Sequence, residues 1–253
     1  MPSSNTSTAA FSVVHAKSDF RSMLRLAIPA LSEEMLVLAV TWTDWWLTGH
    51  FFQSEGDATK TAMSMMGYTM WLIPSLFAAV AIGATALVAR FVGADNSIKA
   101  SKAANQALLI GALMAGLMLS GSLWLGDEFL SVMQLQGTAL VFAKQYFGIV
   151  IWSIPLIMFS IVGAACLRGA GDMVTGFVVK LIVVAANILI SFSLVTGWGP
   201  IEAIGWRGLA IGAAIGHSIG GLIILVVLLR GRAGLQISWE GLRPHFLIIG
   251  QLL

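Results

Sequence analysis

The strongest constraint on the fold of this chain is the spacing of its charges, which leaves long apolar runs without any Asp, Glu, Lys or Arg. One run holds 29 residues between Lys60 and Arg90. Four more, of 21 to 24 residues, lie between Lys102 and Asp127, Lys144 and Arg168, Lys180 and Glu202, and Arg207 and Arg230. A helix needs about 20 apolar residues to cross the hydrocarbon core of a bilayer. Each run therefore predicts one transmembrane helix.

A further span, residues 26–52, is as apolar but is interrupted by three carboxylates. With it, the chain is predicted to be an all-α polytopic membrane bundle of six transmembrane helices. Only 10% of the residues are charged, whereas a soluble domain carries about a quarter. We expect a cytoplasmic tail over residues 1–22, the six-helix lobe over residues 23–229, and a cytoplasmic linker over residues 230–253. The linker would include the start of a truncated seventh helix, because an apolar run begins at Pro244 and stops at Leu253.

The basic residues predict how the bundle is oriented. If the N-terminus is cytoplasmic, eleven Lys and Arg fall on the inner side and only Lys60, Lys144 and Arg207 on the outer side. Such an excess of inner basic residues is the usual signature of membrane topology. The inner residues are Lys17, Arg21, Arg25, Arg90, Lys99, Lys102, Arg168, Lys180, Arg230, Arg232 and Arg243. We therefore expect a multi-pass protein of the inner (plasma) membrane with a cytoplasmic N-terminus. Five tryptophans would then lie near the outer lipid interface, Trp45, Trp46, Trp124, Trp198 and Trp206.

Several function classes lack their residues here. The single cysteine, Cys166, cannot form an intramolecular disulfide, and no Cys/His spacing predicts a metal site. No glycine-rich phosphate loop is present, so ATP-driven transport by this chain is not expected. The net charge of +2 is small and scattered, which does not favour nucleic acid as a partner. We expect no enzyme activity and no cofactor.

Three acidic side chains in the first span are the main candidates for function. A charge within a membrane helix costs at least about 2.5–3.5 kcal/mol, so such residues usually face a bundle interior or a wet cavity. Glu33 and Asp44 are eleven positions apart, about three helical turns, and share one face with Thr41. We interpret Glu33, Glu34 and Thr41 as part of a proton path or substrate cavity, and Asp44 as the site of a coupling ion. The alternative is that one glutamate pairs structurally with a basic group.

Polar residues in the last two spans are predicted to lie at a similar depth. Asn187 and Ser191 are one helical turn apart, and His217 is in the middle of its span. We count His217 among the candidates for the proton path or substrate cavity, although a lone histidine is more often structural. A carboxylate, an amide and a hydroxyl at one level could coordinate Na⁺ or hold a proton, whereas the alternative for Asn187 is an interhelical hydrogen bond. Pro29, Pro74 and Pro155 should interrupt their spans, with Pro29 as a bend in the first helix. Glycines at positions 208, 212 and 216 indicate close helix packing.

The same residues carry a family pattern. The segment LAIPALSEEMLVLAVTWTDWWLTGH resembles the first helix of multidrug and toxic-compound extrusion (MATE) transporters, through Leu26, Pro29, Asp44 and Gly49. The stretch ARFVGADNSIKASKAANQAL resembles the signature that follows the second helix, and LRGAGDM resembles the inner loop after the fourth. Further matching positions follow in order, the Asn of the fifth helix, the turn Gly197 to Pro200, and the residues Gly205 to Gly208.

The resemblance implies a drug/cation antiporter built from two six-helix lobes around a central cavity, of which this chain would be the first lobe. It implies that Asp44 holds the coupling ion, H⁺ or Na⁺, with Asn187 beside it, and it adds Tyr146 as a further candidate for the proton path or substrate cavity. Ser191 stands where the family often has Asp or Asn, and Ala213 where Thr is common. The implied partners are the lipid bilayer, small organic substrates that are often cationic, and either a C-terminal lobe or a second copy of the chain.

Two other functions remain open from the sequence. The related family of lipid-linked saccharide flippases shares the two-lobe fold, and such a carrier would favour a cavity rich in Arg and Lys, which this chain lacks in mid-span. An inactive truncated fragment or a membrane scaffold would also fit the short final apolar run.

Overall fold

The computed structural model describes residue 28 and residues 31–198 and 202–235, and every secondary-structure element among them is a helix. The predicted tail, the predicted seventh helix and the proposed bend at Pro29 lie outside the described residues. The apolar runs explain the helices, because a backbone in lipid must satisfy its hydrogen bonds within its own segment.

The elements follow one another along the chain in the order predicted. Residues 31–51 form the first helix, and a 3-10 turn, η1 (Gln53–Glu55), leads into α2 (Asp57–Gly93) and α3 (Ser97–Val132). The next span is made of consecutive short segments, α4 (Gly137–Val150), η2 (Ile151–Ser153), α5 (Ile154–Met158), η3 (Phe159–Gly163) and α6 (Ala164–Gly169). The last elements are α7 (Met173–Thr196), α8 (Arg207–Leu229) and η4 (Arg232–Gly234).

Five helices in the described part of the chain are long and apolar enough to cross a membrane. They cover Asp57–Gly93, Ser97–Val132, Gly137–Gly169, Met173–Thr196 and Arg207–Leu229. Four of them contain a whole uncharged run, whereas α7 ends at Thr196, before the run that stops at Glu202. The helix of residues 31–51, with its three carboxylates, is not among the five. A sixth crossing at that helix stays a prediction.

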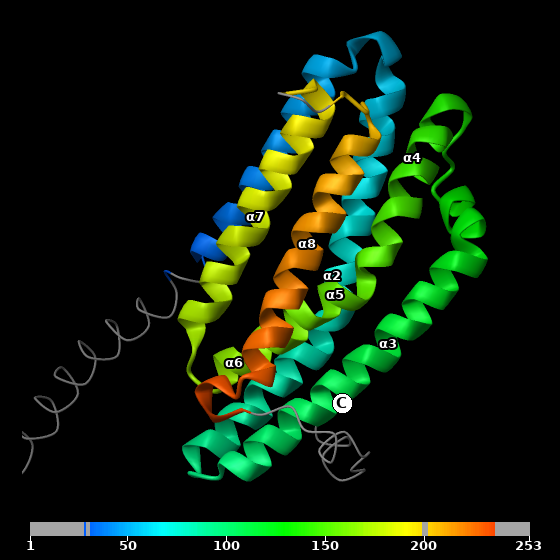
Figure 1. The fold of residues 1–253 in the computed structure, drawn as a ribbon. Helices are drawn as coiled ribbons and strands as arrows, with labels where there is room; N and C mark the ends of the chain where they lie inside the picture. The colour runs from blue at the N-terminus through cyan, green and yellow to red at the C-terminus, as the bar shows by residue number, and fades with distance from the viewer. Residues whose placement is uncertain (1–27, 29–30, 199–201, 236–253) are drawn as a thin grey trace, which may run out of the picture.

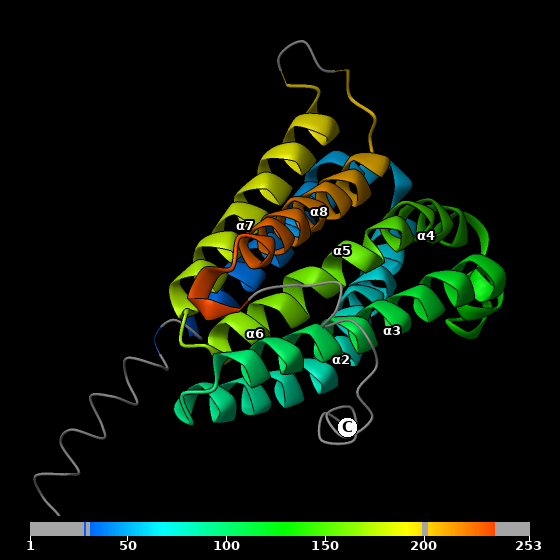
Figure 2. The ribbon, with the colours of Figure 1, turned by 60° about the horizontal axis from the view of Figure 1, so that its bottom comes forward.

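The span made of α4, α5 and α6 separates two pairs of helices. In Figure 2, α7 and α8 lie on one side of this span and α2 and α3 on the other. The helix of residues 31–51 runs beside α7 and α8 in both views (Figures 1 and 2). The buried core lies between these layers and includes Phe77, Met158 and Leu209. We call the end with residues 94–96, 170–172 and 230–235 the inner end, since it is predicted to be cytoplasmic, and the opposite end the outer end.

Glycines let α7 and α8 approach each other closely. A Cβ atom on Gly212 would lie 2.8 Å from the backbone nitrogen of Ser191, and one on Gly216 would lie 3.1 Å from the Cβ of Asn187. Contacts this short are not tolerated without movement of the neighbouring helix. The close packing predicted from the four-residue glycine spacing is therefore confirmed.

The two described prolines of the membrane spans behave differently. The helix α2 continues through Pro74 as one element, so the predicted interruption there does not appear as a break. At Pro155 the interruption is present, since a 3-10 turn precedes this residue and a π-helical turn follows at Phe159–Gly163. Proline lacks the N–H of a helical hydrogen bond, and π-turns accommodate such a lost bond by changing the helical register.

An ion pair at the inner end fixes the chain that leaves α8. The guanidinium of Arg232 lies 2.7 Å from the carboxylate of Asp172, which also caps α7 by accepting hydrogen bonds from Thr175. Nearby, the Ser101 hydroxyl donates to the carbonyl of Gly234, and the Leu235 side chain is buried. Burial raises the pKa of Asp172, but the hydrogen bonds from Arg232 and Thr175 outweigh it and hold this pKa below its ordinary value.

Asp172→Asn should loosen this anchor while keeping the helix cap, since Asn caps helices as well as Asp. Trypsin should then cleave after Arg230 and Arg232 faster, by at most about fivefold, because an exposed ion pair contributes about 0–1 kcal/mol. Because the folded pKa is lowered, the anchor contributes stability above the ordinary aspartate pKa of about 3.9 and loses it as the pH falls further. The control is Asp95→Asn, an exposed carboxylate at the same end. Equal cleavage rates in both variants would contradict the anchor.

Candidate functional site

A cavity of about 1090 Å³ lies between the helix of residues 31–51, α2, the span that contains α4, η3 and α6, and the facing sides of α7 and α8. Most of its wall is apolar, and the polar residues that line it come from every one of these elements. Seven residues predicted from the sequence line it together, Glu33, Glu34, Thr41, Asp44, Tyr146, Asn187 and His217. Their roles stay predictions, but the fold brings them to one place.

Asp44 is the most buried carboxylate of this wall. Its side chain is 6% exposed, and its Oδ1 atom has no hydrogen-bond partner among the described residues. The neighbouring hydroxyl of Thr48 does not supply one, because it donates to the main-chain carbonyl of Asp44 at 2.7 Å. The phenol of Tyr146 is within electrostatic range of Asp44. A buried polar atom without a partner costs about 1–3 kcal/mol, and more when it is charged, so a bare charge on this carboxylate is unfavourable.

Asn187 and Ser191 are held by the tight contact between α7 and α8. Asn187 is 3% exposed and lines the cavity, whereas Ser191 is fully buried beside Gly212 and does not line it. The Ser191 hydroxyl donates a long hydrogen bond of 3.5 Å to Oδ1 of Asn187. Ser191 is therefore connected to the cavity only by its hydrogen bond to Asn187. Its place in an ion site remains a prediction.

Tyr146 belongs to an aromatic cluster with Trp206 and Phe142. The indole N–H of Trp206 donates to the carbonyl of Phe142 at 2.8 Å, and its ring lies 6.2 Å from that of Tyr146. Trp206 lies at the outer start of α8, as predicted, but it is only 4% exposed, so its ring faces the protein and differs in this from an exposed interfacial tryptophan. The hydrogen bond explains the difference, because it satisfies the indole inside the protein and removes the need for interfacial water. Trp124 and Trp198, in contrast, are 84% and 65% exposed, as an interfacial position requires.

Charged residues of both signs line the inner part of the cavity. A carboxylate oxygen of Glu33 lies 3.5 Å from the guanidinium of Arg168, which is the pairing considered as the structural alternative for a glutamate. Lys180 lines the same wall, within electrostatic range of Glu33 and Glu34, and His217 lies close to Lys180.

Sequence reasoning missed Lys180 and Arg168, because it counted both as charges of the inner loops. The structure places Lys180 seven residues after Met173, the first residue of α7, or about 10 Å inside the helix. The spacing held a usable signal, since Lys180 and Asn187 are seven positions apart and two helical turns place them on one face.

Three aromatic side chains on the cavity wall were also missed, Trp45, Tyr68 and Trp71. Tyr68 and Trp71 are three positions apart on α2, and Ser75 follows after four more on the same wall. This spacing identifies one helical face, and with its two aromatic rings it could have been recognised in the sequence.

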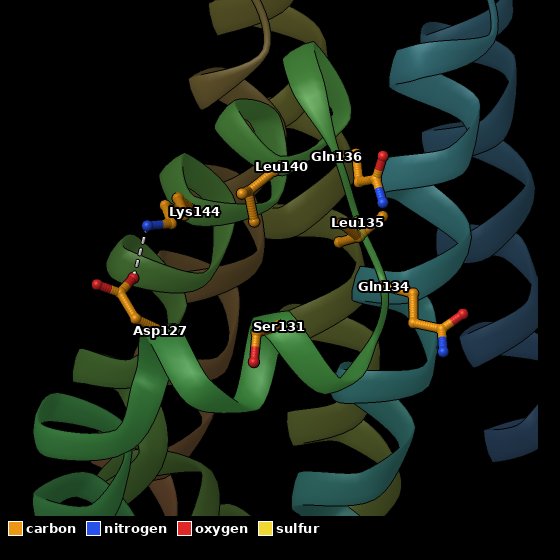
Figure 3. A pocket seen from close by; sticks show the side chains of 7 residues that line it. All are labelled: Asp127, Ser131, Gln134, Leu135, Gln136, Leu140 and Lys144. Carbon is orange, nitrogen blue, oxygen red and sulfur yellow. Dashed lines mark ion pairs between the residues drawn. The ribbon is translucent and has the colours of Figure 1, made fainter.

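A smaller pocket of about 580 Å³ lies near the outer end, where α3 turns into α4. Figure 3 shows the pair that borders it, Lys144 and Asp127, whose charged atoms are 2.8 Å apart. Both side chains are largely exposed. Since both charges already have a partner there, the larger cavity is the better candidate for function.

The site offers no metal centre of the usual kind. Within the described ranges, no three His, Cys, Asp or Glu residues come together in a group that could hold a metal ion. Oxygen ligands for a monovalent cation are present at Asp44 and Asn187.

A comparison with known protein families agrees with the family resemblance found in the sequence. The model of the MatE family matches residues 29–193, a stretch that runs from the first helix into the last turn of α7. It contains Asp44, Lys180 and Asn187, and of the helices that line the cavity only α8 lies outside the matched region.

Two curated relatives are similar over most of the chain. It is 25% identical over 214 residues to the "Probable multidrug resistance protein NorM" of Thermotoga maritima, covering 83% of this chain and 44% of that protein. It is 24% identical over 212 residues to the "FAD transporter" of Shewanella oneidensis, covering 81% of this chain and 46% of that protein. The chain thus spans less than half the length of these relatives.

Solved structures show the same fold. The outward-facing conformation of a multidrug resistance MATE family transporter of the MOP superfamily superposes with a TM-score of 0.81 at 20% identity, covering 90% of this chain and 49% of that one. A MATE transporter in its bent conformation gives a TM-score of 0.79, also at 20% identity, covering 90% of this chain and half of that chain.

Proposed function

This chain belongs to the MatE family of membrane transporters, which are not enzymes, and on that premise we propose that its cavity binds organic cations in exchange for H⁺ or Na⁺. In this proposal the chain is one six-helix lobe of a two-lobe exporter. The observation that carries it is the buried oxygen of Asp44, which has no hydrogen-bond partner among the described residues and lies on the wall of a large cavity.

A carboxylate in this position binds whatever neutralises it. A proton, a Na⁺ ion or an organic cation would each relieve the cost of a buried charge. Only one positive charge is needed for one carboxylate, so binding of the ion and binding of the organic cation should exclude one another. Such mutual exclusion is the thermodynamic requirement for exchange, because each ligand must lower the affinity for the other.

The remaining wall favours an aromatic or greasy cation. Trp45, Tyr68 and Trp71 line the cavity with aromatic side chains, and Met63 and Met70 lie on the α2 part of the same wall. Ring faces attract cations, and methionine side chains adapt to ligands of different shape. The cavity volume of about 1090 Å³ exceeds what a drug-sized molecule requires.

Orientation and assembly belong to the same proposal. The eleven-to-three distribution of basic residues supports a cytoplasmic N-terminus in the inner membrane. In the outward-facing MATE structure the chain corresponds to about half of the molecule. We therefore infer that a second six-helix lobe, or a second copy of this chain, completes the central cavity.

The signs of charge in the cavity do not favour the flippase alternative. A carrier of lipid-linked saccharides would be expected to line its cavity mainly with basic groups. Here four carboxylates line the described wall, at Glu33, Glu34, Asp44 and Asp172, against the two basic groups of Arg168 and Lys180.

Binding of tetraphenylphosphonium to the purified chain in lipid nanodiscs tests this function. Trp71→Ala should weaken binding about twofold to fivefold, since Trp71 is 70% exposed and a cation–π contact at an exposed site contributes about 0.5–1 kcal/mol. The matched control is Trp124→Ala, because Trp124 is as exposed but lies on α3 outside the cavity. Absence of binding to the parent chain, or equal effects of the two changes, would reject the cavity as the site.

A further inference from the structure

Lys180, in the inner part of the cavity, carries a positive charge that has no direct partner among the described residues. No ion pair or hydrogen bond of Lys180 occurs among the described residues, although Glu33 and Glu34 lie within electrostatic range. The side chain is half-buried on α7 and lines the cavity wall. An ammonium group in such a place is poorly hydrated and attracts an anion more strongly than it would in water.

The neighbouring carboxylates do not account for Lys180. Glu33 is already paired with Arg168 at 3.5 Å. Glu34 is exposed on its helix, so water can solvate its charge without help from Lys180. His217, the other titratable group near Lys180, carries no negative charge in any protonation state.

The position of Lys180 relative to Asn187 and Asp44 indicates which charged groups a ligand of this cavity would carry. Lys180 and Asn187 lie on one face of α7, about 10 Å apart along the helix axis. Asp44, on the helix of residues 31–51, contributes a carboxylate to the wall of the same cavity. A compound that meets both groups must carry a positive and a negative group separated by several ångströms.

We propose that Lys180 forms a subsite for a carboxylate or similar anionic group, so that the cavity selects zwitterionic aromatic compounds over simple cations. This inference rests on the proposed function, since it adds a second contact to the same cavity. The cationic part of the ligand lies by Asp44 and the aromatic wall, and the anionic part lies by Lys180. The ligand then replaces water at the Lys180 ammonium with a charge-assisted hydrogen bond.

The test uses two rhodamine dyes that differ in one group, a zwitterion with a free carboxylate and its methyl ester, which is only cationic. Fluorescence anisotropy measures the binding of each dye to the chain in nanodiscs. Lys180→Met, which nearly keeps the side-chain volume, should weaken the carboxylate dye about tenfold, the usual effect of losing one charge-assisted hydrogen bond. The methyl ester should bind the variant and the parent equally. Lys99→Met, an exposed lysine outside the cavity, is the matched control and should change neither dye.

Each other outcome overturns the inference in a recognisable way. Equal weakening of both dyes would mean that Lys180 only balances Glu33 and Glu34. A parent chain that binds the ester but not the carboxylate dye would exclude an anionic subsite and leave the proposed function intact. Binding of neither dye would reject the proposed function itself. If Lys180→Met does not fold, Lys180→Arg decides, because it keeps the charge and should keep the preference for the carboxylate dye. Loss of that preference in Lys180→Arg would contradict the subsite.

Discussion

Asp44→Asn should still bind tetraphenylphosphonium, but its binding should no longer respond to pH or Na⁺. Asn nearly keeps the volume of Asp and carries no charge, so it resembles the neutralised form of Asp44 at every pH. In the parent chain, affinity for the organic cation should fall as the pH falls or as Na⁺ rises, because the ion then occupies the carboxylate. Typical coupling free energies of about 1–3 kcal/mol correspond to changes of about 5- to 150-fold. The affinity of Asp44→Asn should stay near the low-pH value of the parent.

The control is Asp57→Asn, whose carboxylate is almost fully exposed at the outer end of the bundle. It should keep the pH and Na⁺ dependence of the parent, since an exposed charge interacts little with a distant cavity. If the cation binding of Asp44→Asn depended on pH and Na⁺ as in the parent chain, Asp44 would not be the ion site. The ion site would then have to be sought at Glu33 and Glu34, the other carboxylates of the first helix.

Gly212→Ala should be the most destabilising small change in the α7–α8 contact. The added methyl group would meet both the side chain of Ser191 and its backbone nitrogen, the latter at 2.8 Å. Backbone atoms cannot rotate away, so the two helices must separate, at a cost of about 2–3 kcal/mol. The same movement would displace Asn187, one turn along α7, and so should also weaken the response of cation binding to Na⁺.

The one cysteine of the chain reports this destabilisation directly. Cys166 is fully buried on α6, so a fluorogenic maleimide reacts with it only when the bundle opens. The midpoint of thermal labelling should fall in Gly212→Ala. It should not fall in Gly116→Ala, where a Cβ atom on α3 meets nothing within 4 Å. A shared midpoint would show that α7 and α8 are packed less tightly than the structure indicates.

The course of the chain could be predicted from the sequence because length and apolarity alone determine which segments can lie in a membrane. Each of the five uncharged runs corresponds to one long apolar helix. Two of these helices end close to the charge that ends the run, at Gly169 just after Arg168 and at Gly93 just after Arg90. Asp44 stood out for the same reason, since a carboxylate in an apolar span needs a special environment.

It was harder to predict which side of each helix faces the cavity, because a helix that is apolar on all sides has no polar face to mark one side. Ser191 was expected at the ion site but lies behind Asn187 against Gly212, and only the tight α7–α8 contact reveals this. Lys180 was assigned to a loop because charge was taken as the end of a span. In the structure this charge lies inside the helix, on the wall of the cavity.

The exchange of ions for organic cations at Asp44 is the central claim, and ion release measures it most directly. Tetraphenylphosphonium is added to the chain in nanodiscs in weak buffer, and the released protons are counted with a pH indicator, or released Na⁺ with an electrode. We expect about one ion to be displaced for each cation that binds to the parent chain, because one carboxylate accepts one positive charge. We expect none for Asp44→Asn. Cation binding to the parent without ion release, or with the same release in Asp44→Asn, would contradict this claim.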